Sequence, residues 1–246
     1  MEHTSDARLL RILNDFNESK IILVEWETPL LRRLGVPLAP KEDLLFLVPD
    51  EQLHLADNIV KARGLPVGDH SLSYLSEFAN QGFRYVFDDP ISRLMLVPLS
   101  WTGIKQEELI AIEPASSIPP CTTLTVPLPY FCTAYLRIIM QEEAGSMVRV
   151  MAIADLSGVI AYSMFDMTYE GSYMSCPEDN IDEAGDVLTD GEKEKRAEKE
   201  ALEMENALNS IREWHFTPET EWARDILIRL VSGTLRYELL PCKGQE

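Results

Sequence analysis

The sequence has few of the residues that build common metal and redox sites. Its 246 residues include four cysteines and four histidines, and neither type occurs in a Cys-x-x-Cys, His-x-His or His-Glu-x-x-His spacing. Zinc ligands normally come in such closely spaced pairs. We therefore expect no zinc cluster. The scattered cysteines predict buried free thiols, and with them a reducing, cytoplasmic location.

Positive charge is also scarce. The chain has 22 Lys and Arg against 41 Asp and Glu, which gives a net charge of −19. Such a chain repels a phosphate backbone unless its basic residues gather in one groove. The sequence contains no basic cluster of that kind, so we expect no nucleic-acid partner and no binding to anionic membranes.

Long apolar runs are missing as well. No uninterrupted apolar stretch reaches the roughly 18 residues of a membrane span, and the N-terminal residues lack a charged-then-apolar signal region. The hydrophobic share of 46% and the charged share of 26% are those of an ordinary globular protein. These features again favour a cytoplasmic location.

The first part of the chain alternates between helical and strand patterns. Hydrophobic spacing and turn residues predict helices and strands in the order helix, strand, helix, strand, helix, at residues 6–16, 21–24, 28–34, 44–48 and 50–63. Thr28 before Pro29 is the predicted N-cap of the second helix, and Asp50 that of the third. The run at 44–48 is apolar throughout, which is typical of a strand covered on both faces.

A hairpin is predicted next. After a short helix at 71–80, strands at 84–87 and 93–99 flank the turn Asp88-Asp89-Pro90, where Asp and Pro favour a turn. An antiparallel hairpin added to parallel strands makes the sheet mixed. The predicted fold class is therefore α/β (α+β), a mixed sheet with flanking helices.

The second part of the chain is predicted to be helical. Apolar residues recur at helical spacing from Pro127 and through 148–164, and a charged helix is expected at 192–213, with a last helix opened by Thr217-Pro218. Gly185 and Gly191 mark an acidic, flexible loop at about 177–191. We expect an αβ domain at 1–115 and a helical domain at 116–246.

The element order, together with Leu34-Gly35-Val36-Pro37, the acidic strand entrance at Glu42-Asp43 and Val48-Pro49-Asp50, resembles an uncharacterised fungal family with a degenerate nucleotidyltransferase-like fold. The likeness covers about residues 5–100. In active members of the wider superfamily, a Gly-Ser turn after the first strand holds nucleotide phosphates. Two carboxylates at i and i+2 on the next strand bind divalent metal, and a third acid lies on a later strand.

The chain departs from that pattern at each point. Glu25-Trp26-Glu27-Thr28 stands where the resemblance implies a Gly-Ser turn, and acids and an indole there disfavour phosphate. Asp43 is followed at i+2 by Leu45, and the strand at 93–99 has no acid. One carboxylate rarely holds catalytic magnesium. We expect no metal site and no cofactor.

Several polar residues are candidates for chemistry. Glu25, Asp43 and Asp155 are candidate general acids or bases, and the candidate ligand-binding residues are Trp26, Glu27, Arg84, Tyr85 and Trp101. Each acid also has a structural interpretation: Glu25 or Glu27 could pair with Arg32 or Arg33, Asp43 could cap a strand entrance, and Asp155 needs a partner inside an apolar helix.

Three functions stay open. The favoured hypothesis is a degenerate nucleotidyltransferase-fold protein that binds a small molecule or a protein partner without metal-dependent nucleotidyl transfer. The alternatives are a metal-independent enzyme of small-metabolite (secondary metabolism) chemistry that uses a carboxylate in a cleft between the domains, and an active nucleotidyltransferase with unusual metal ligands. A protein partner could also bind the charged helix at 192–213.

Overall fold

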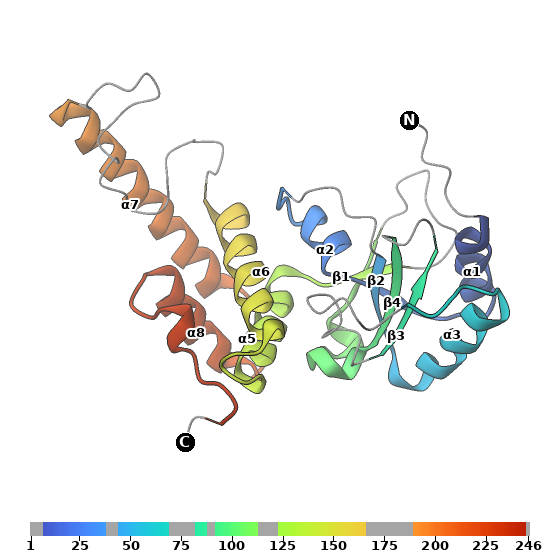
Figure 1. The fold of residues 1–246 in the computed structure, drawn as a ribbon. Coiled ribbons are helices and arrows are strands. Elements are labelled where there is room, and N and C mark those ends of the chain that lie inside the picture. Colours follow the sequence, from blue (N-terminus) through green and yellow to red (C-terminus); the bar gives the residue numbers. More distant parts are fainter. Residues whose placement is uncertain are drawn as a thin grey trace. The chain divides into compact units, whose positions relative to one another are not determined.

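The computed structural model describes residues 7–37, 44–68, 82–87, 92–112, 123–165 and 189–244 (Figure 1). The chain forms two compact units, Met1–Leu156 with Pro241–Glu246 and Ser157–Leu240. The boundary expected after residue 115 stays a prediction. The expected helix at 71–80, the Asp88-Asp89-Pro90 turn and nearly all of the acidic loop lie outside the described residues.

The first unit is built on a mixed sheet, as the sequence predicts. Among the described residues six strands have the order β3-β4-β2-β1-β6-β5. β2 pairs parallel with β4 and β1 parallel with β6, whereas the other pairs are antiparallel. The strands are β1 Leu23–Trp26, β2 Leu44–Val48, β3 Phe83–Val86, β4 Arg93–Pro98, β5 Ile110–Ala111 and β6 Thr123–Thr125.

Seven α-helices lie among the described residues. They are α1 Ala7–Glu18, α2 Thr28–Arg33, α3 Asp50–Ala62, α5 Leu128–Gln141, α6 Met147–Met164, α7 Asp190–Glu213 and α8 Glu221–Val231. Short 3-10 turns are η1 Leu99–Thr102, η2 Gln106–Glu108 and η3 Tyr237–Leu239. Within the described residues α6 alone has the length and composition to cross a membrane, and 33% of its apolar window is buried. Core helices of globular proteins meet the same criterion.

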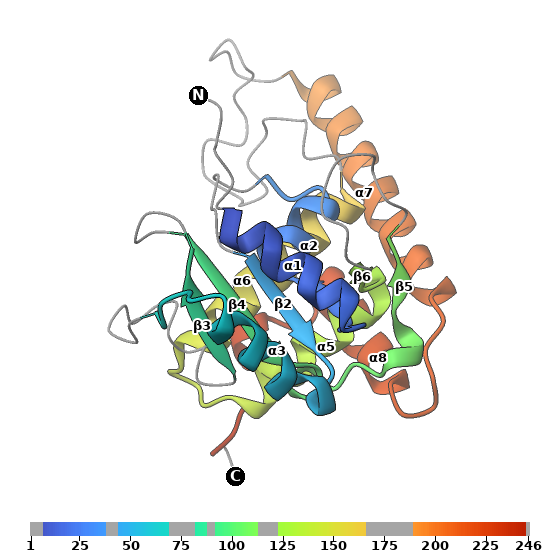
Figure 2. The same cartoon turned by 90° about the vertical axis from the view of Figure 1, so that its right-hand side faces the viewer.

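The two faces of the sheet have different partners. Leu23, Phe46 and Leu96 share one face and form a hydrophobic core with residues of α1 and α3. Figure 2 shows both helices over this face of the sheet. Trp26 points to the opposite face, because successive side chains of a strand alternate, and there it contacts α5. The end of β1 therefore offers neighbouring side chains to both layers.

Side-chain burial corrects the predicted stripe of α1. The helical spacing of Leu9, Leu10, Leu13 and Phe16 predicts that these four residues face the core. Leu10 is instead 42% exposed, and Ile12 is fully buried. The 3.6-residue period places the buried residues Leu9, Ile12, Leu13 and Phe16 on one face of α1. Leu10 lies outside that face.

The predicted starts of three helices, α2, α3 and α8, are wrong. Glu27, with φ 53°, precedes α2, and Thr28 is its first residue. Pro49 precedes α3, and the Asp50 carboxylate instead accepts hydrogen bonds from Ser100 N at 3.1 Å and Ser100 Oγ at 2.5 Å. A tertiary contact thus replaces the local cap.

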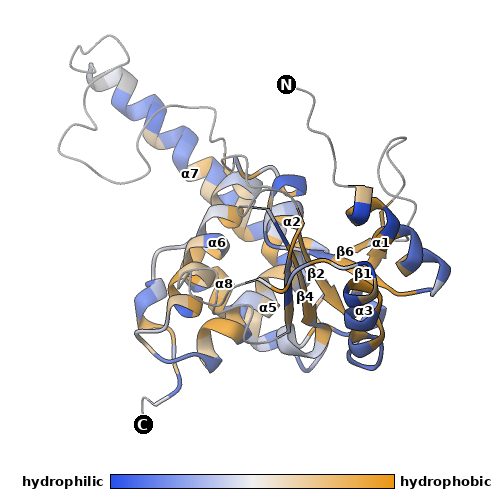
Figure 3. Ribbon diagram, turned by 45° about the vertical axis from the view of Figure 1, so that its right-hand side comes forward, coloured by the Kyte–Doolittle hydropathy of each residue, from blue (hydrophilic) through white to orange (hydrophobic). Residues whose placement is uncertain are grey.

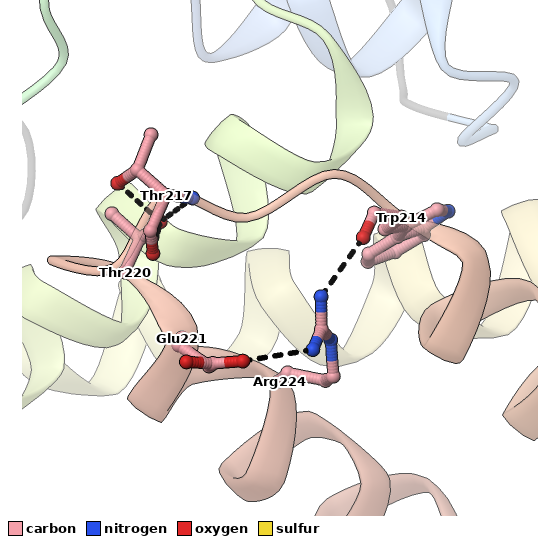
Figure 4. Close-up of polar contacts among 5 residues, drawn as sticks. All are labelled: Trp214, Thr217, Thr220, Glu221 and Arg224. Carbon is pink, nitrogen blue, oxygen red and sulfur yellow. Dashed lines mark hydrogen bonds and ion pairs between the residues drawn. The ribbon is translucent and has the colours of Figure 1, made fainter.

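The last helix begins later than predicted. α8 starts at Glu221, because Thr217 and Thr220 form a turn in which Thr217 N donates to Thr220 Oγ1 at 2.9 Å (Figure 4). Thr220 N also donates to Thr217 O at 2.9 Å. The Thr217-Pro218 pair therefore shapes the turn before the helix.

Apolar residues at steps of four and three predict a stripe along α7, made of Ala197, Ala201, Met204, Leu208 and Ile211. Only part of that stripe packs: Ile211 is buried and Met204 and Leu208 are half-buried, whereas Ala197 and Ala201 are exposed, and Ala207, outside the stripe, is buried. The N-terminal part of α7 is largely hydrophilic in Figure 3, and ion pairs at i, i+4 such as Arg196–Glu200 lie along it. The buried side chains described on α7 therefore lie in its last two turns, the end that leads to α8.

Candidate functional site

The C-terminal end of β1 gathers polar side chains between the two layers that cover the sheet. Glu25 pairs across the ladder with Phe46 of β2, and Trp26 pairs with Leu45. Glu27 follows directly and has a backbone φ of 53°. A left-handed backbone is uncommon outside glycine and often accompanies a functional or tightly constrained position.

Trp26 is the centre of a buried aromatic cluster. Its indole is fully buried and stacks on Tyr135 of α5 with ring centroids 5.0 Å apart and an interplanar angle of 18°. Phe131, one turn earlier on α5, lies 5.8 Å from Trp26 and 4.3 Å from Tyr135. Trp26 Nε1 is a buried donor without an acceptor among the described residues. Such a donor is costly in a folded protein unless a water or ligand accepts from it.

Tyr135 connects the aromatic cluster to two carboxylates. Its hydroxyl donates to Asp155 Oδ2 of α6 at 3.2 Å. Burial raises the pKa of Tyr135 well above its ordinary value of 10.0, and the negative charges of Asp155 and Glu27 raise that pKa further. The phenol therefore stays protonated and can serve as a hydrogen-bond donor. Glu27 is 4% exposed and Asp155 is half-buried.

Glu25 is held by an arginine of α2. Arg33 Nε lies 2.6 Å from Glu25 Oε2, and Arg33 Nη2 lies 2.8 Å from Oε1, a bidentate arrangement. Hydrogen bonding to this carboxylate raises the pKa of Arg33. Of the pairings that the sequence left open between Glu25 or Glu27 and Arg32 or Arg33, the structure shows that of Glu25 with Arg33. A catalytic role for Glu25 stays a prediction.

The two candidates on β3 lie away from this cluster. Tyr85 is on β3, separated from β1 by β4 and β2, and its buried hydroxyl donates to Asp57 of α3. Burial, with this bond and the Asp57 charge, raises the pKa of Tyr85. Arg84 is also buried on β3. Trp101 is half-buried in η1, and Asp43 lies outside the described residues.

The structure thus brings together Trp26, Glu27 and Asp155 from the predicted candidates. We name these three residues and Tyr135 the carboxylate–tyrosine site. Sequence reasoning placed Tyr135 on an apolar helical stripe and gave it no role. A tyrosine on a buried stripe needs a partner for its hydroxyl, and that requirement was a usable signal.

The described residues contain no group of three or more His, Cys, Asp or Glu placed to hold a metal ion. Asp155 accepts a hydrogen bond from the Tyr135 hydroxyl, and the charge of Glu27 acts on the same phenol, so carboxylate and phenol groups gather near the end of β1. The arrangement thus holds a buried hydrogen-bond donor, the Trp26 indole N–H, and a carboxylate acceptor, that of Asp155.

The chain matches no protein-family model and no curated protein sequence. Among solved structures, the antibiotic-resistance factor ANT(2'')-Ia, an aminoglycoside nucleotidyltransferase, is similar at 17% identity and a TM-score of 0.37. The alignment covers 66% of this chain and 91% of that chain. A likeness of this size supports no argument about activity or substrate.

Proposed function

We propose that the chain acts by binding a small molecule or a protein partner at the carboxylate–tyrosine site, without metal-dependent nucleotidyl transfer. The observation that carries this proposal is the fully buried Trp26 indole stacked on Tyr135. The resemblance to the nucleotidyltransferase-like family implies that a Gly-Ser turn would receive phosphate here. In this chain Trp26 is the last residue of β1, and the turn that follows begins with the buried acid Glu27, which disfavours a phosphate.

The charges around Trp26 support the same proposal. Glu25 lies on one side of it in the chain and is neutralised by Arg33, whereas Glu27 on the other side is buried near Tyr135. A buried carboxylate repels a nucleotide phosphate at short range because the local dielectric is low. The site instead favours a neutral or cationic group that donates hydrogen bonds.

Isothermal titration calorimetry tests the proposal. ATP and CTP are titrated into the full chain with and without Mg²⁺, and no heat of binding is expected at micromolar concentration. Micromolar binding that requires Mg²⁺, and that Glu27→Gln weakens, would overturn the proposal and favour a nucleotidyltransferase with unusual metal ligands.

A thermal-shift screen of small neutral and cationic metabolites identifies the ligand. We expect a stabilising compound to lose its effect in Asp155→Asn. The matched control is Asp15→Asn, because Asp15 is an acid held by Arg63 on a different part of the first unit. A ligand whose effect survives Asp155→Asn and Glu27→Gln binds elsewhere and contradicts the proposed site.

A metal-independent enzyme is the second candidate, and the contact between the Tyr135 hydroxyl and Asp155 favours it. A carboxylate next to a buried phenol can accept or return a proton during turnover. Glu25, Asp43 and Asp155 are the proposed acid or base groups. Product analysis of the small metabolite found in the screen, with wild type and Asp155→Asn, distinguishes turnover from simple binding.

A cytoplasmic location without nucleic-acid or membrane partners completes the proposal. The free, buried thiols of Cys132 and Cys242 and the net charge of −19 support it. Fluorescence microscopy of the tagged chain and co-sedimentation with anionic vesicles test it. Secretion, or sedimentation with the vesicles, would contradict it.

A further inference from the structure

Arg149, in the first turns of α6, is a buried arginine that donates to two backbone carbonyls. Its side chain is 3% exposed. Nη1 donates to the carbonyl oxygen of Ile139 in the last turn of α5, and to that of Pro241 at 3.0 Å. The carbonyls at a helix C-terminus have no partner inside the helix, and they carry partial negative charge. Arg149 thus satisfies the end of α5 from the start of α6.

The C-terminal residues join the same contact. Lys243 N donates to Glu142 O, the residue that follows α5, at 3.0 Å. Glu143 and Lys243 form an isolated parallel bridge, and Cys242 between these contacts is 7% exposed. Residues 241–244 therefore lie against the α5–α6 connection, within the same compact unit.

The connection itself is short and capped. Ser146 Oγ accepts a hydrogen bond from Arg149 N at 3.1 Å, as an N-cap side chain does. Ser146 N donates to Glu143 O at 3.0 Å. The turn, the buried guanidinium and the C-terminal residues thus hold the ends of α5 and α6 at several points.

These contacts lie close to the carboxylate–tyrosine site. Tyr135 precedes Ile139 by four residues, so the two residues share one face of α5. Asp155 follows Arg149 by six residues on α6, about 9 Å along the axis at the usual rise per residue. A shift of α6 against α5 would therefore change the 3.2 Å contact between Tyr135 and Asp155 directly.

We propose that Arg149 and residues 241–244 form a C-terminal clasp that sets the register of α6 against α5 and so positions Asp155 on the Tyr135 hydroxyl. Arg149 is then a positioning residue of the site. A buried guanidinium is costly to leave without acceptors, so the clasp favours the one register in which both carbonyls are reached. The inference rests on the proposed function only in treating the carboxylate–tyrosine site as the binding site.

NMR of the full chain labelled with [ζ-¹³C]tyrosine tests the clasp without any ligand. The Tyr135 signal is assigned from its loss in Tyr135→Phe. In the wild-type background, Asp155→Asn is expected to shift this signal, because it changes the acceptor of the hydroxyl. In Arg149→Met, the Tyr135 signal should already be displaced, and adding Asp155→Asn should shift it no further.

Two milder changes keep the test decisive if Arg149→Met does not fold. Arg149→Lys, which can still reach one carbonyl, should restore part of the response to Asp155→Asn. Lys243→Pro removes the N–H that donates to Glu142 O, whereas Lys243→Ala keeps it. The proline variant should displace the Tyr135 signal and the alanine variant should not.

Arg137→Met is the matched control, because Arg137 is also on α5 and donates to a backbone carbonyl, that of Gly103, at 2.5 Å. We expect it to leave the Tyr135 signal in place. The clasp is overturned if Arg149→Lys and Lys243→Pro are folded by circular dichroism and still show the full wild-type response to Asp155→Asn. Since no ligand is present, that failure is distinct from a failure of the proposed function.

Discussion

Arg33 of α2 grips the carboxylate of Glu25 on β1 with two nitrogens, at 2.6 and 2.8 Å. The Glu25 side chain is 8% exposed and that of Arg33 46% exposed, so a half-solvated arginine neutralises a buried acid. This pair ties the short helix α2 back to the strand that precedes it. It also holds the end of β1, from which Trp26 and Glu27 continue.

Replacing Arg33 should lower the stability of the folded chain. Arg33→Met leaves the Glu25 carboxylate buried without its partner, and we expect the free energy of unfolding to fall by about 1–3 kcal/mol. Adding Glu25→Gln to Arg33→Met should recover part of the loss, because the two residues interact. Urea denaturation measures both. Arg236→Met is the control, because Arg236 and Glu238 form a highly exposed pair, and it should change the free energy by less than about 0.5 kcal/mol.

The raised pKa of Tyr135 predicts a loss of folding stability at alkaline pH. Its pKa is raised in the folded state above the ordinary 10.0, so the unfolded chain loses the phenol proton first as pH rises. The contribution of this group is fully present below about pH 10 and is lost as pH rises further. Thermal unfolding between pH 8 and 11 should show a smaller alkaline decline in Tyr135→Phe than in wild type.

The control for that prediction is Tyr162→Phe. Tyr162 is 38% exposed on α6, so its replacement should leave the alkaline slope as it is in wild type. An identical slope for Tyr135→Phe and wild type would show that the phenol ionises as readily in the folded chain as in the unfolded chain.

The contact of Asp57 with Tyr85 should contribute more to the free energy of unfolding than its contact with Lys61. The buried Tyr85 hydroxyl donates to Asp57 Oδ1, while Lys61 Nζ lies 2.8 Å from Oδ2 with a side chain that is 53% exposed. Tyr85→Phe is expected to lower the free energy of unfolding by about 1 kcal/mol, and Lys61→Met by less than about 0.5 kcal/mol. Chemical denaturation gives the order. The reverse order would mean that the surface cation, not the phenol, stabilises Asp57.

Between α7 and α8, the contacts of Arg224 are expected to contribute to the free energy of unfolding. Its guanidinium lies 5.0 Å from the centre of the Phe216 ring. Its nitrogens donate to Trp214 O and Glu221 Oε1, each at 3.2 Å (Figure 4). Arg224→Met should cost about 1–2 kcal/mol. Arg229→Met, at an exposed position of the same helix, should cost less than about 0.5 kcal/mol. If Arg224→Met and Arg229→Met lower the unfolding midpoint equally, the contacts of Arg224 do not stabilise this corner.

Local patterns predicted most of the first unit, and their failures have physical reasons. The strand at 44–48, the antiparallel pair around 88–90 and the helix after Pro49 carry their signals in a few adjacent residues, and each was found. β5 and β6 have two and three residues, too few for a period, and exist because they pair with each other and with β1. The predicted cap at Asp50 is wrong because the Asp50 carboxylate accepts a hydrogen bond from Ser100, fifty residues away in the chain.

The candidate site shows the same division. The ion pair between Glu25 and Arg33 was predictable, because the residues are eight apart in a strand–helix turn. The contact of Tyr135 with Asp155, and its stacking on Trp26, join three elements that lie up to 129 residues apart. No spacing in the chain encodes those distances.

Composition and periodicity alone established an acidic αβ chain with a mixed sheet, a helical second part and an acidic, aromatic end to its first strand, because burial and charge follow from residue type and spacing. Only the tertiary structure decided which side chains meet at that strand end. The packing of α5 across the sheet placed a tyrosine from a plain apolar stripe against the indole and within hydrogen-bond distance of Asp155. Packing of that kind depends on shape across the whole unit.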